Sequence, residues 1–176
     1  MVKARPTQKV KLVAGLLASD TALFARAAAL LERALRNKVD FESEVSDFSH
    51  TDYYTKEMGP GLKRKFISFE KVVDPEGLYK VKLAANKLER RLSSGERRVI
   101  NIDPGYLDLS KLVLFSTKDY SHRIYLRNGI YAEVTLFYRD RAFNPWPWTY
   151  PDYKTPGYKR IFGHIRDTYK KQMGRI

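Results

Sequence analysis

The order of apolar and polar positions predicts that the chain opens with a buried strand and an amphipathic helix. Residues 9–17 carry a nearly continuous apolar run, which is typical of a strand buried on both faces. After the potential helix cap Ser19-Asp20, apolar residues recur every three or four positions between 23 and 35, which predicts a helix. Apolar and polar residues then alternate over 39–45, which predicts a half-buried strand.

A second pattern of strand, helix and strand follows. Residues 50–61 form a turn-rich loop, and alternation resumes over 65–73 as a strand. An Asp-Pro pair then offers a cap and a proline for the first helical position, so residues 75–95 predict a second helix. Residues 99–102 read as a short strand that ends at the Asp-Pro-Gly turn of residues 103–105.

The last part of the chain predicts a hairpin and a terminal helix. Residues 107–115 fit a helix or a strand, and their apolar spacing favours a helix. Two alternating runs, 122–126 and 130–138, flank Asn128-Gly129, a pair that favours the positive φ angles of a tight hairpin turn. Thr155-Pro156 predicts the start of the last helix.

The order of these elements predicts an α+β fold. Strand, helix, strand, strand, helix and strand match a ferredoxin-like βαββαβ core, an antiparallel sheet with helices on one face. The C-terminal β-hairpin and terminal helix would extend this core, and a larger mixed sheet with the hairpin at its centre is the alternative. The 176 residues fit a single domain over 1–176, in which 139–176 form a proline- and aromatic-rich strap and a basic C-terminal helix.

Composition and charge narrow the classes of function. The absence of cysteine excludes disulfides, thiolate metal sites and cysteine nucleophiles. No stretch approaches the roughly 20 apolar residues of a membrane span, so we expect a cytoplasmic protein without a membrane partner. The net charge is +13, and residues 1–11 and 139–176 carry most of the excess. Basic ends suit a polyanion, although a solvated Lys/Arg surface also serves solubility.

Polar residues at the predicted ends of elements form the first candidate ligand site. Lysine, arginine and histidine near a glycine turn suit a phosphate or another oxyanion. We expect His122 and Arg123 to point to opposite faces of a strand. The alternative is structural: Asp103 caps a turn, Arg123 pairs with Glu133 across the hairpin, and His122 lies on the surface. The candidate ligand-binding residues, including the cations that follow Gly59, are Lys63, Arg64, Asp103, Tyr106, Lys118, Asp119, His122, Arg123 and Glu133.

Metal and catalytic chemistry have weaker sequence support. The three histidines fall in three separate predicted elements, so we expect no zinc site. Asp52, Asp103 and Asp119 leave a magnesium site open, because Mg²⁺ needs only one or two carboxylates beside substrate phosphates. No pattern identifies catalytic residues or a cofactor, so the sequence leaves open whether the protein is an enzyme.

The C-terminal segment combines aromatic residues with cations. Such a combination suits single-stranded nucleic acid, in which bases stack on rings and phosphates meet positive charge. The alternative, which we favour, is a proline-stiffened strap whose rings are buried against the domain. The aromatic residues are Phe143, Trp146, Trp148, Tyr150, Tyr153 and Tyr158, and the cations of the following helix are Lys159, Arg160, Arg166, Lys170 and Lys171.

Several long strings of residues are distinctive: 51–54 (TDYY), 57–64 (EMGPGLKR), 101–107 (NIDPGYL), 118–126 (KDYSHRIYL), 129–136 (GIYAEVTL) and 147–153 (PWTYPDY). Together they resemble a bacterial family filed as domain of unknown function 4416, whose members are sometimes labelled GTP-binding proteins. The resemblance covers nearly the whole chain and implies no mechanism.

The GTP label conflicts with the residues. A P-loop needs a glycine-rich loop that ends in Lys-Ser/Thr, and residues 59–63 (GPGLK) are too short, while Pro60 lacks an N–H donor. We therefore expect a protein that binds a phosphate-bearing small ligand, such as a nucleotide, without a P-loop. The alternatives are an RNA-binding protein that uses the basic termini and the aromatic segment, and a partner-protein adaptor without a small ligand.

Overall fold

The computed structural model describes residues 6–49, 54–93, 95 and 97–174, and it confirms the α+β class. Its described strands form one nine-stranded antiparallel sheet of order β2-β4-β1-β5-β6-β8-β7, with β3 on β4 and β9 on β8. The strands are β1 Lys11–Ala18, β2 Val39–Glu42, β3 Ser46–Asp47, β4 Lys63–Phe69, β5 Ile100–Leu107, β6 Lys111–Ser116, β7 Ile124–Arg127, β8 Ile130–Arg139 and β9 Ala142–Pro145. The helices are α1 Ala22–Leu35, α2 Thr55–Met58, α3 Tyr79–Leu92, α4 Pro156–Met173 and a 3-10 helix at Pro151–Lys154.

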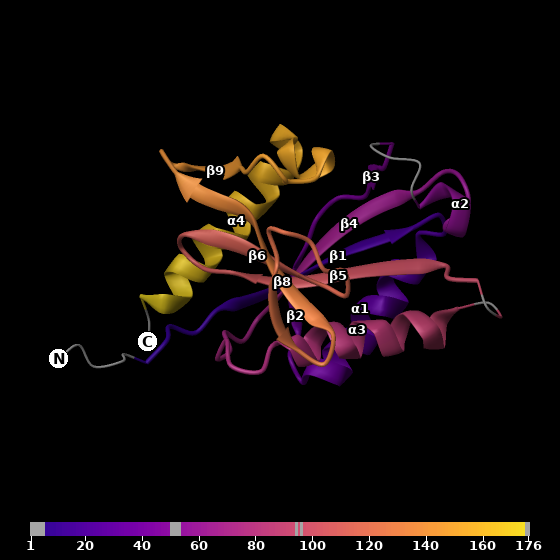
Figure 1. Cartoon of the computed structure of the whole chain (residues 1–176), viewed down its shortest axis with the longest axis horizontal. Coiled ribbons are helices and arrows are strands. Elements are labelled where there is room, and N and C mark those ends of the chain that lie inside the picture. Colours follow the sequence, from indigo (N-terminus) through magenta and orange to yellow (C-terminus); the bar gives the residue numbers. More distant parts are fainter. Residues whose placement is uncertain (1–5, 50–53, 94, 96, 175–176) are drawn as a thin grey trace.

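Helices cover both faces of this sheet (Figure 1). Leu12 and Leu16 of β1 pack in the core under α1 and α3, whereas Val13 belongs to the core under α4. The continuous apolar run of β1 follows from this arrangement, because both faces of the strand are covered. No helix in the described part of the chain has the length and apolarity that crossing a membrane requires.

The helix predicted for residues 107–115 is wrong, because the chain forms β6 there. The side chain of Asp108 accepts hydrogen bonds from the backbone N–H groups of Ser110 and Lys111, at 2.7 and 2.9 Å. These bonds close a tight turn, so β5 and β6 pair as a hairpin. The strand before the turn runs to Leu107, and the turn predicted at residues 103–105 therefore lies inside β5.

Two further element boundaries differ from the predictions. Helix α3 begins at Tyr79, four residues later than predicted, because Gly77 adopts a φ of 74° that a right-handed helix does not allow. The loop predicted for residues 50–61 contains the short helix α2, and residues 50–53 of it lie outside the described part.

The hairpin of β5 and β6 is paired only near its turn. Gly105, Tyr106 and Leu107 pair with residues of β6, whereas the first half of β5 has no partner strand on that side. In a strand, Pro104 can donate no backbone hydrogen bond. The two strands therefore diverge, and a wedge opens between β5 and the end of β6.

Candidate functional site

Side chains of α3 form hydrogen bonds with backbone groups of β5 at the edge where β5 has no partner strand. The ammonium of Lys82 donates to the carbonyl of Ile102 at 2.8 Å, and the N–H of Ile102 donates to a carboxylate oxygen of Glu89 at 2.7 Å. Lys82 and Glu89 are seven positions apart, so two helical turns place them on one side of α3. Both are buried, with exposed fractions of 7 and 8%. Because an unsatisfied buried backbone group costs about 1–3 kcal/mol, these contacts stabilise an edge that lacks a partner strand.

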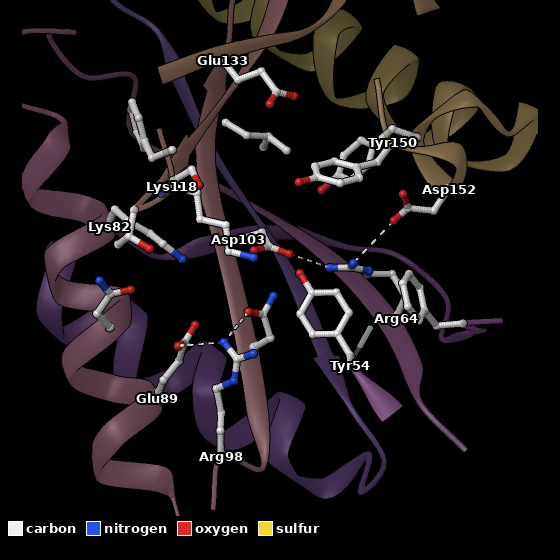
Figure 2. Close-up of a pocket in the computed structure, with 18 of the residues that line it drawn as sticks. Tyr54, Arg64, Lys82, Glu89, Arg98, Asp103, Lys118, Glu133, Tyr150 and Asp152 are labelled. Carbon is white, nitrogen blue, oxygen red and sulfur yellow. Dashed lines mark hydrogen bonds and ion pairs between the residues drawn. The ribbon is translucent and has the colours of Figure 1, made fainter. Parts of the chain in front are cut away.

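A cavity of about 1050 Å³ occupies the wedge. Its walls come from α3, β4, β5, the segment from β6 to Arg123, β8 and residues 150–153. The predicted candidates that line it come from four separate parts of the chain: Arg64 from β4, Asp103 from β5, Lys118 and Arg123 from the segment after β6, and Glu133 from β8. Figure 2 shows how the side chains on these walls approach one another.

Arg64 of β4 lines the cavity together with the two carboxylates that it contacts; we call this group the floor of the cavity. Its guanidinium donates to Asp103 at 3.1 Å and to Asp152 at 3.5 Å, and it lies 5.0 Å from the centre of the Phe48 ring. Gly15 of β1 leaves the room for this arrangement, because a Cβ there would lie 3.1 Å from the guanidinium. The buried cation is therefore held by two carboxylates and an aromatic face.

The pKa values of the two carboxyl groups that contact Arg64, Asp103 and Asp152, are shifted in opposite directions. Burial alone would raise the pKa of Asp103, but the cations of Arg64 and Lys82 outweigh it and lower that pKa. Burial raises the pKa of Asp152, and the lowering by Arg64 does not compensate. The negative charge of Asp103, together with burial, also raises the pKa of Tyr54, which keeps this phenol neutral. Asp103 is thus the ionised partner of Arg64, and Asp152 takes up a proton more readily.

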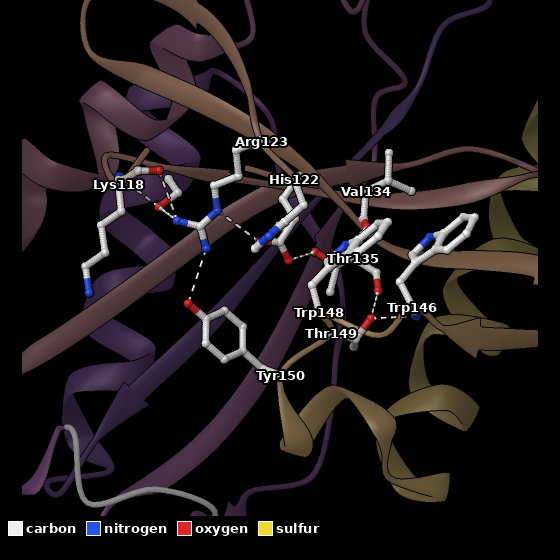
Figure 3. Close-up of polar contacts among 11 residues, drawn as sticks. Lys118, His122, Arg123, Val134, Thr135, Trp146, Trp148, Thr149 and Tyr150 are labelled. Atoms are coloured by element: carbon white, nitrogen blue, oxygen red, sulfur yellow. Dashed lines mark hydrogen bonds and ion pairs between the residues drawn. The ribbon is translucent and has the colours of Figure 1, made fainter. Parts of the chain in front are cut away.

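A second charged group forms the opposite wall. Arg123 donates from Nε to Glu133 at 2.9 Å, from Nη1 to the hydroxyl of Ser116 at 2.9 Å and from Nη2 to the hydroxyl of Tyr150 at 3.2 Å (Figure 3). The predicted pairing of Arg123 with Glu133 is therefore present. His122 Nε2 lies 3.0 Å from the same oxygen of Glu133. The expectation that His122 and Arg123 point to opposite faces is wrong, because both precede β7 and converge on one carboxylate.

A family model described as a domain of unknown function (DUF4416) matches residues 8–169. The chain belongs to this family. No curated protein and no solved structure matches the chain.

Four candidates lie outside the cavity of this DUF4416 member. Lys63 forms an ion pair with Asp47 at the edge of the sheet. Tyr106 points to the other face, where it contacts Phe115 and lines a separate hollow of about 340 Å³. Asp119 is exposed and does not line the cavity. His122 is stacked between the rings of Tyr120 and Trp148, at 5.9 and 5.5 Å between ring centres, and does not line the cavity.

Sequence reasoning missed several residues of the site. Lys82 and Glu89 stand beside the apolar positions of α3, and a charged pair seven residues apart on that side could have indicated a buried role. Asp152 lies in the string PDY of the aromatic segment, where nothing in the pattern marks it as a partner of Arg64. Residues of α3 became part of the site only because β5 and β6 diverge.

The magnesium alternative gains no support from the described residues. No group of three or more His, Asp or Glu side chains within them could hold a metal ion. Asp52 lies outside the described part, and Asp103 lines the cavity whereas Asp119 does not.

The aromatic segment of this family member divides into a buried part and an exposed part. Phe143, Tyr153 and Tyr158 are 1–5% exposed and pack in the core under α4, as the strap interpretation predicts. Trp148 and Tyr150 keep exposed fractions of 38 and 44%. The segment therefore closes the core and also presents rings near the cavity.

Proposed function

We propose that the cavity between β5 and β6 binds a phosphate-bearing small ligand, such as a nucleotide. The observation that carries the proposal is the convergence of cations from separate elements in one hollow: Arg64 from β4, Lys82 from α3, and Lys118 and Arg123 from the segment after β6. Cations placed by different elements on a shared cavity are the usual basis of oxyanion binding. The cavity of about 1050 Å³ lies just above the range of roughly 300–1,000 Å³ for ligand pockets, so it has room for a ligand of nucleotide size.

Aromatic rings support a ligand with a flat ring beside its phosphate. Tyr54, Tyr120 and Tyr150 line the cavity with Phe48. The hydroxyl of Tyr150 accepts a hydrogen bond from Arg123, so ring and cation are held together at the rim. A nucleobase or a similar ring could stack on such surfaces while its phosphate meets the cations.

The proposed binding does not use a P-loop. The glycines at 59 and 61, with φ angles of 86° and 71°, lead into strand β4. A P-loop leads into a helix, whose N-terminus faces the phosphates. Lys63, which would have to reach the phosphates, forms an ion pair with Asp47.

We also propose that the part from β1 to β5 is a ferredoxin-like unit. Leaving out the short elements β3 and α2, its order along the chain is β1, α1, β2, β4, α3 and β5. Its order in the sheet is β2-β4-β1-β5, with α1 and α3 in one core on the same face. The hairpin that follows β6 then adds to the sheet on the side of β5.

Calorimetry with a panel of nucleotides tests the ligand proposal. We expect the wild type to bind at least one member, and Lys118→Gln to weaken that binding about fivefold, which corresponds to about 1 kcal/mol for an exposed cation. Lys171→Gln is the matched control, because Lys171 is exposed on α4 and does not line the cavity. A folded wild type that binds no nucleotide, or an equal loss in both variants, would contradict the proposal.

A second candidate, binding of single-stranded RNA, is favoured by the exposed rings. Tyr120, Trp148 and Tyr150 are 38–50% exposed; Tyr120 and Tyr150 contact Arg123, and Trp148 stacks on His122. Stacking of a base on an aromatic side chain contributes about 1–3 kcal/mol. Trp148→Ala should therefore weaken RNA binding roughly tenfold in fluorescence anisotropy, and the affinity of the wild type should fall steeply with salt. If neither the Trp148→Ala substitution nor added salt weakens RNA binding, RNA does not bind at these exposed rings.

A further inference from the structure

One row of α3 side chains faces the cavity. Lys82, Asn86 and Arg90 all line it, and they are spaced by four residues along the helix. Residues at this spacing lie above one another on the same side of a helix. With a rise of 1.5 Å per residue, the backbone positions of the row extend over about 12 Å. The cavity thus has a long polar wall along α3.

The acidic residue of α3, Glu89, interacts electrostatically with Lys82 but forms no ion pair with Arg90. Glu89 is directed to β5, where it accepts from Ile102, and its other oxygen lies 3.7 Å from Arg98. Arg90 forms no ion pair with any residue that the structure describes. The two other arginines of the cavity differ from Arg90, because Arg64 pairs with Asp103 and Asp152 and Arg123 pairs with Glu133.

The two lysines of the cavity extend this positive wall. Lys82 is fixed at the bottom of the row, where its ammonium donates to Ile102 and keeps further N–H donors. Lys118 comes from the segment after β6, and Figure 2 shows Lys82 and Lys118 directed into the same cavity. Arg90 lies two turns further along α3 than Lys82. Lys82, Arg90 and Lys118 therefore lie along an elongated space and do not surround one small anion site.

We infer that the ligand carries two or more linked phosphoryl groups, which lie along Lys82, Asn86 and Arg90 with Lys118 opposite. This inference rests on the proposed function and names the class of ligand for the same cavity. A single phosphate carries a charge of about −1.5 to −2 and cannot engage both ends of the row at once. A chain of linked phosphates matches the length of the row and the three positive charges of Lys82, Arg90 and Lys118. The amide of Asn86 provides neutral donors between the two α3 cations.

Calorimetry with inorganic phosphate, pyrophosphate and tripolyphosphate tests the inference on the full chain. We expect pyrophosphate to bind more tightly than phosphate, and tripolyphosphate to bind at least about tenfold more tightly than phosphate, because linked phosphoryl groups reach more than one cation of the row. Arg90→Gln should weaken tripolyphosphate binding about fivefold and leave the binding of phosphate nearly unchanged. Arg91→Gln is the matched control, because Arg91 is an exposed cation of the same helix that does not line the cavity.

The outcomes separate this inference from the proposed function. If nucleoside monophosphates bind and tripolyphosphate binds no more tightly than phosphate, the cavity still takes a phosphate ligand but the inference is wrong. If Arg91→Gln weakens tripolyphosphate binding as much as Arg90→Gln, the binding reflects the overall positive charge and the inference is also wrong. If a folded protein binds no phosphate compound, both are wrong. Arg90 and Arg91 are exposed, so neither variant removes a buried contact, and far-UV circular dichroism checks their folding.

Discussion

Lys82→Met should destabilise the protein through the open edge of β5. The substitution keeps most of the apolar stem and removes the ammonium that donates to the carbonyl of Ile102 at 2.8 Å. Lys82 is only 7% exposed, so water has little access to replace the lost donor. A buried carbonyl without a partner costs about 1–3 kcal/mol, and we expect a loss of about 2 kcal/mol in the free energy of unfolding. For a domain of this size, that corresponds to a fall of roughly 4–8 °C in Tm.

Urea denaturation followed by circular dichroism measures this loss. Lys87→Met is the matched control, because Lys87 is an exposed lysine of the same helix, and its change should stay within about 0.5 kcal/mol. Removing the Lys82 cation should also raise the pKa of Asp103, which that cation lowers. Equal stabilities of the two variants would refute the idea that α3 side chains hold the edge of β5.

Two further predictions concern the ion pairs of Asp103 and Lys11. The lowered pKa of Asp103 means that its pairing with Arg64 stabilises the fold fully above the ordinary pKa of 3.8, and that this contribution is lost as pH falls below that value toward the lowered pKa. Urea titrations below pH 4 should therefore show a steeper loss of stability in the wild type than in Asp103→Asn, and parallel curves would contradict this. Lys11 is fully buried and donates to Asp40 at 2.6 Å, so Lys11→Met should cost about 3 kcal/mol of unfolding free energy, because it leaves the Asp40 carboxylate without its cation. A urea midpoint equal to that of the wild type would contradict it.

Elements with their own periodicity were predictable from the sequence. Helices α1 and α4 carry apolar residues at helical spacing, and the Asn-Gly turn between β7 and β8 has the positive φ angles that this pair favours. Strand β6 was not predictable in this way, because its apolar spacing fits a helix as well. The pairing of β6 with β5 and β8 decides between them, and that pairing depends on residues far away along the chain.

The candidate site was predictable where polar residues stand in strands or at their ends. Asp103, Arg123 and Glu133 are residues of that kind, and they meet in one cavity. Lys82 and Glu89 were missed because their partner is the backbone of Ile102, which needs them only if no strand pairs with it. Whether a strand pairs with β5 at Ile102 depends on the path of β6, and the sequence pattern of α3 does not indicate that path.

The string Asp103-Pro104-Gly105 explains why the wedge opens at this point of the sheet. Ile102 turns its N–H and C=O toward the open edge, and alternation along a strand turns the backbone of Pro104 the same way. Pro104 therefore has no N–H to offer to β6 at the position where the next pair would form. At Gly105 the strands approach so closely that a Cβ would lie 2.0 Å from the carbonyl oxygen of Val113. Gly105 thus allows β5 and β6 to pair closely, and Pro104 ends that pairing. The three residues that resemble a turn in the sequence therefore set the boundary of the cavity. Asp103 lies next to this boundary and lines the cavity.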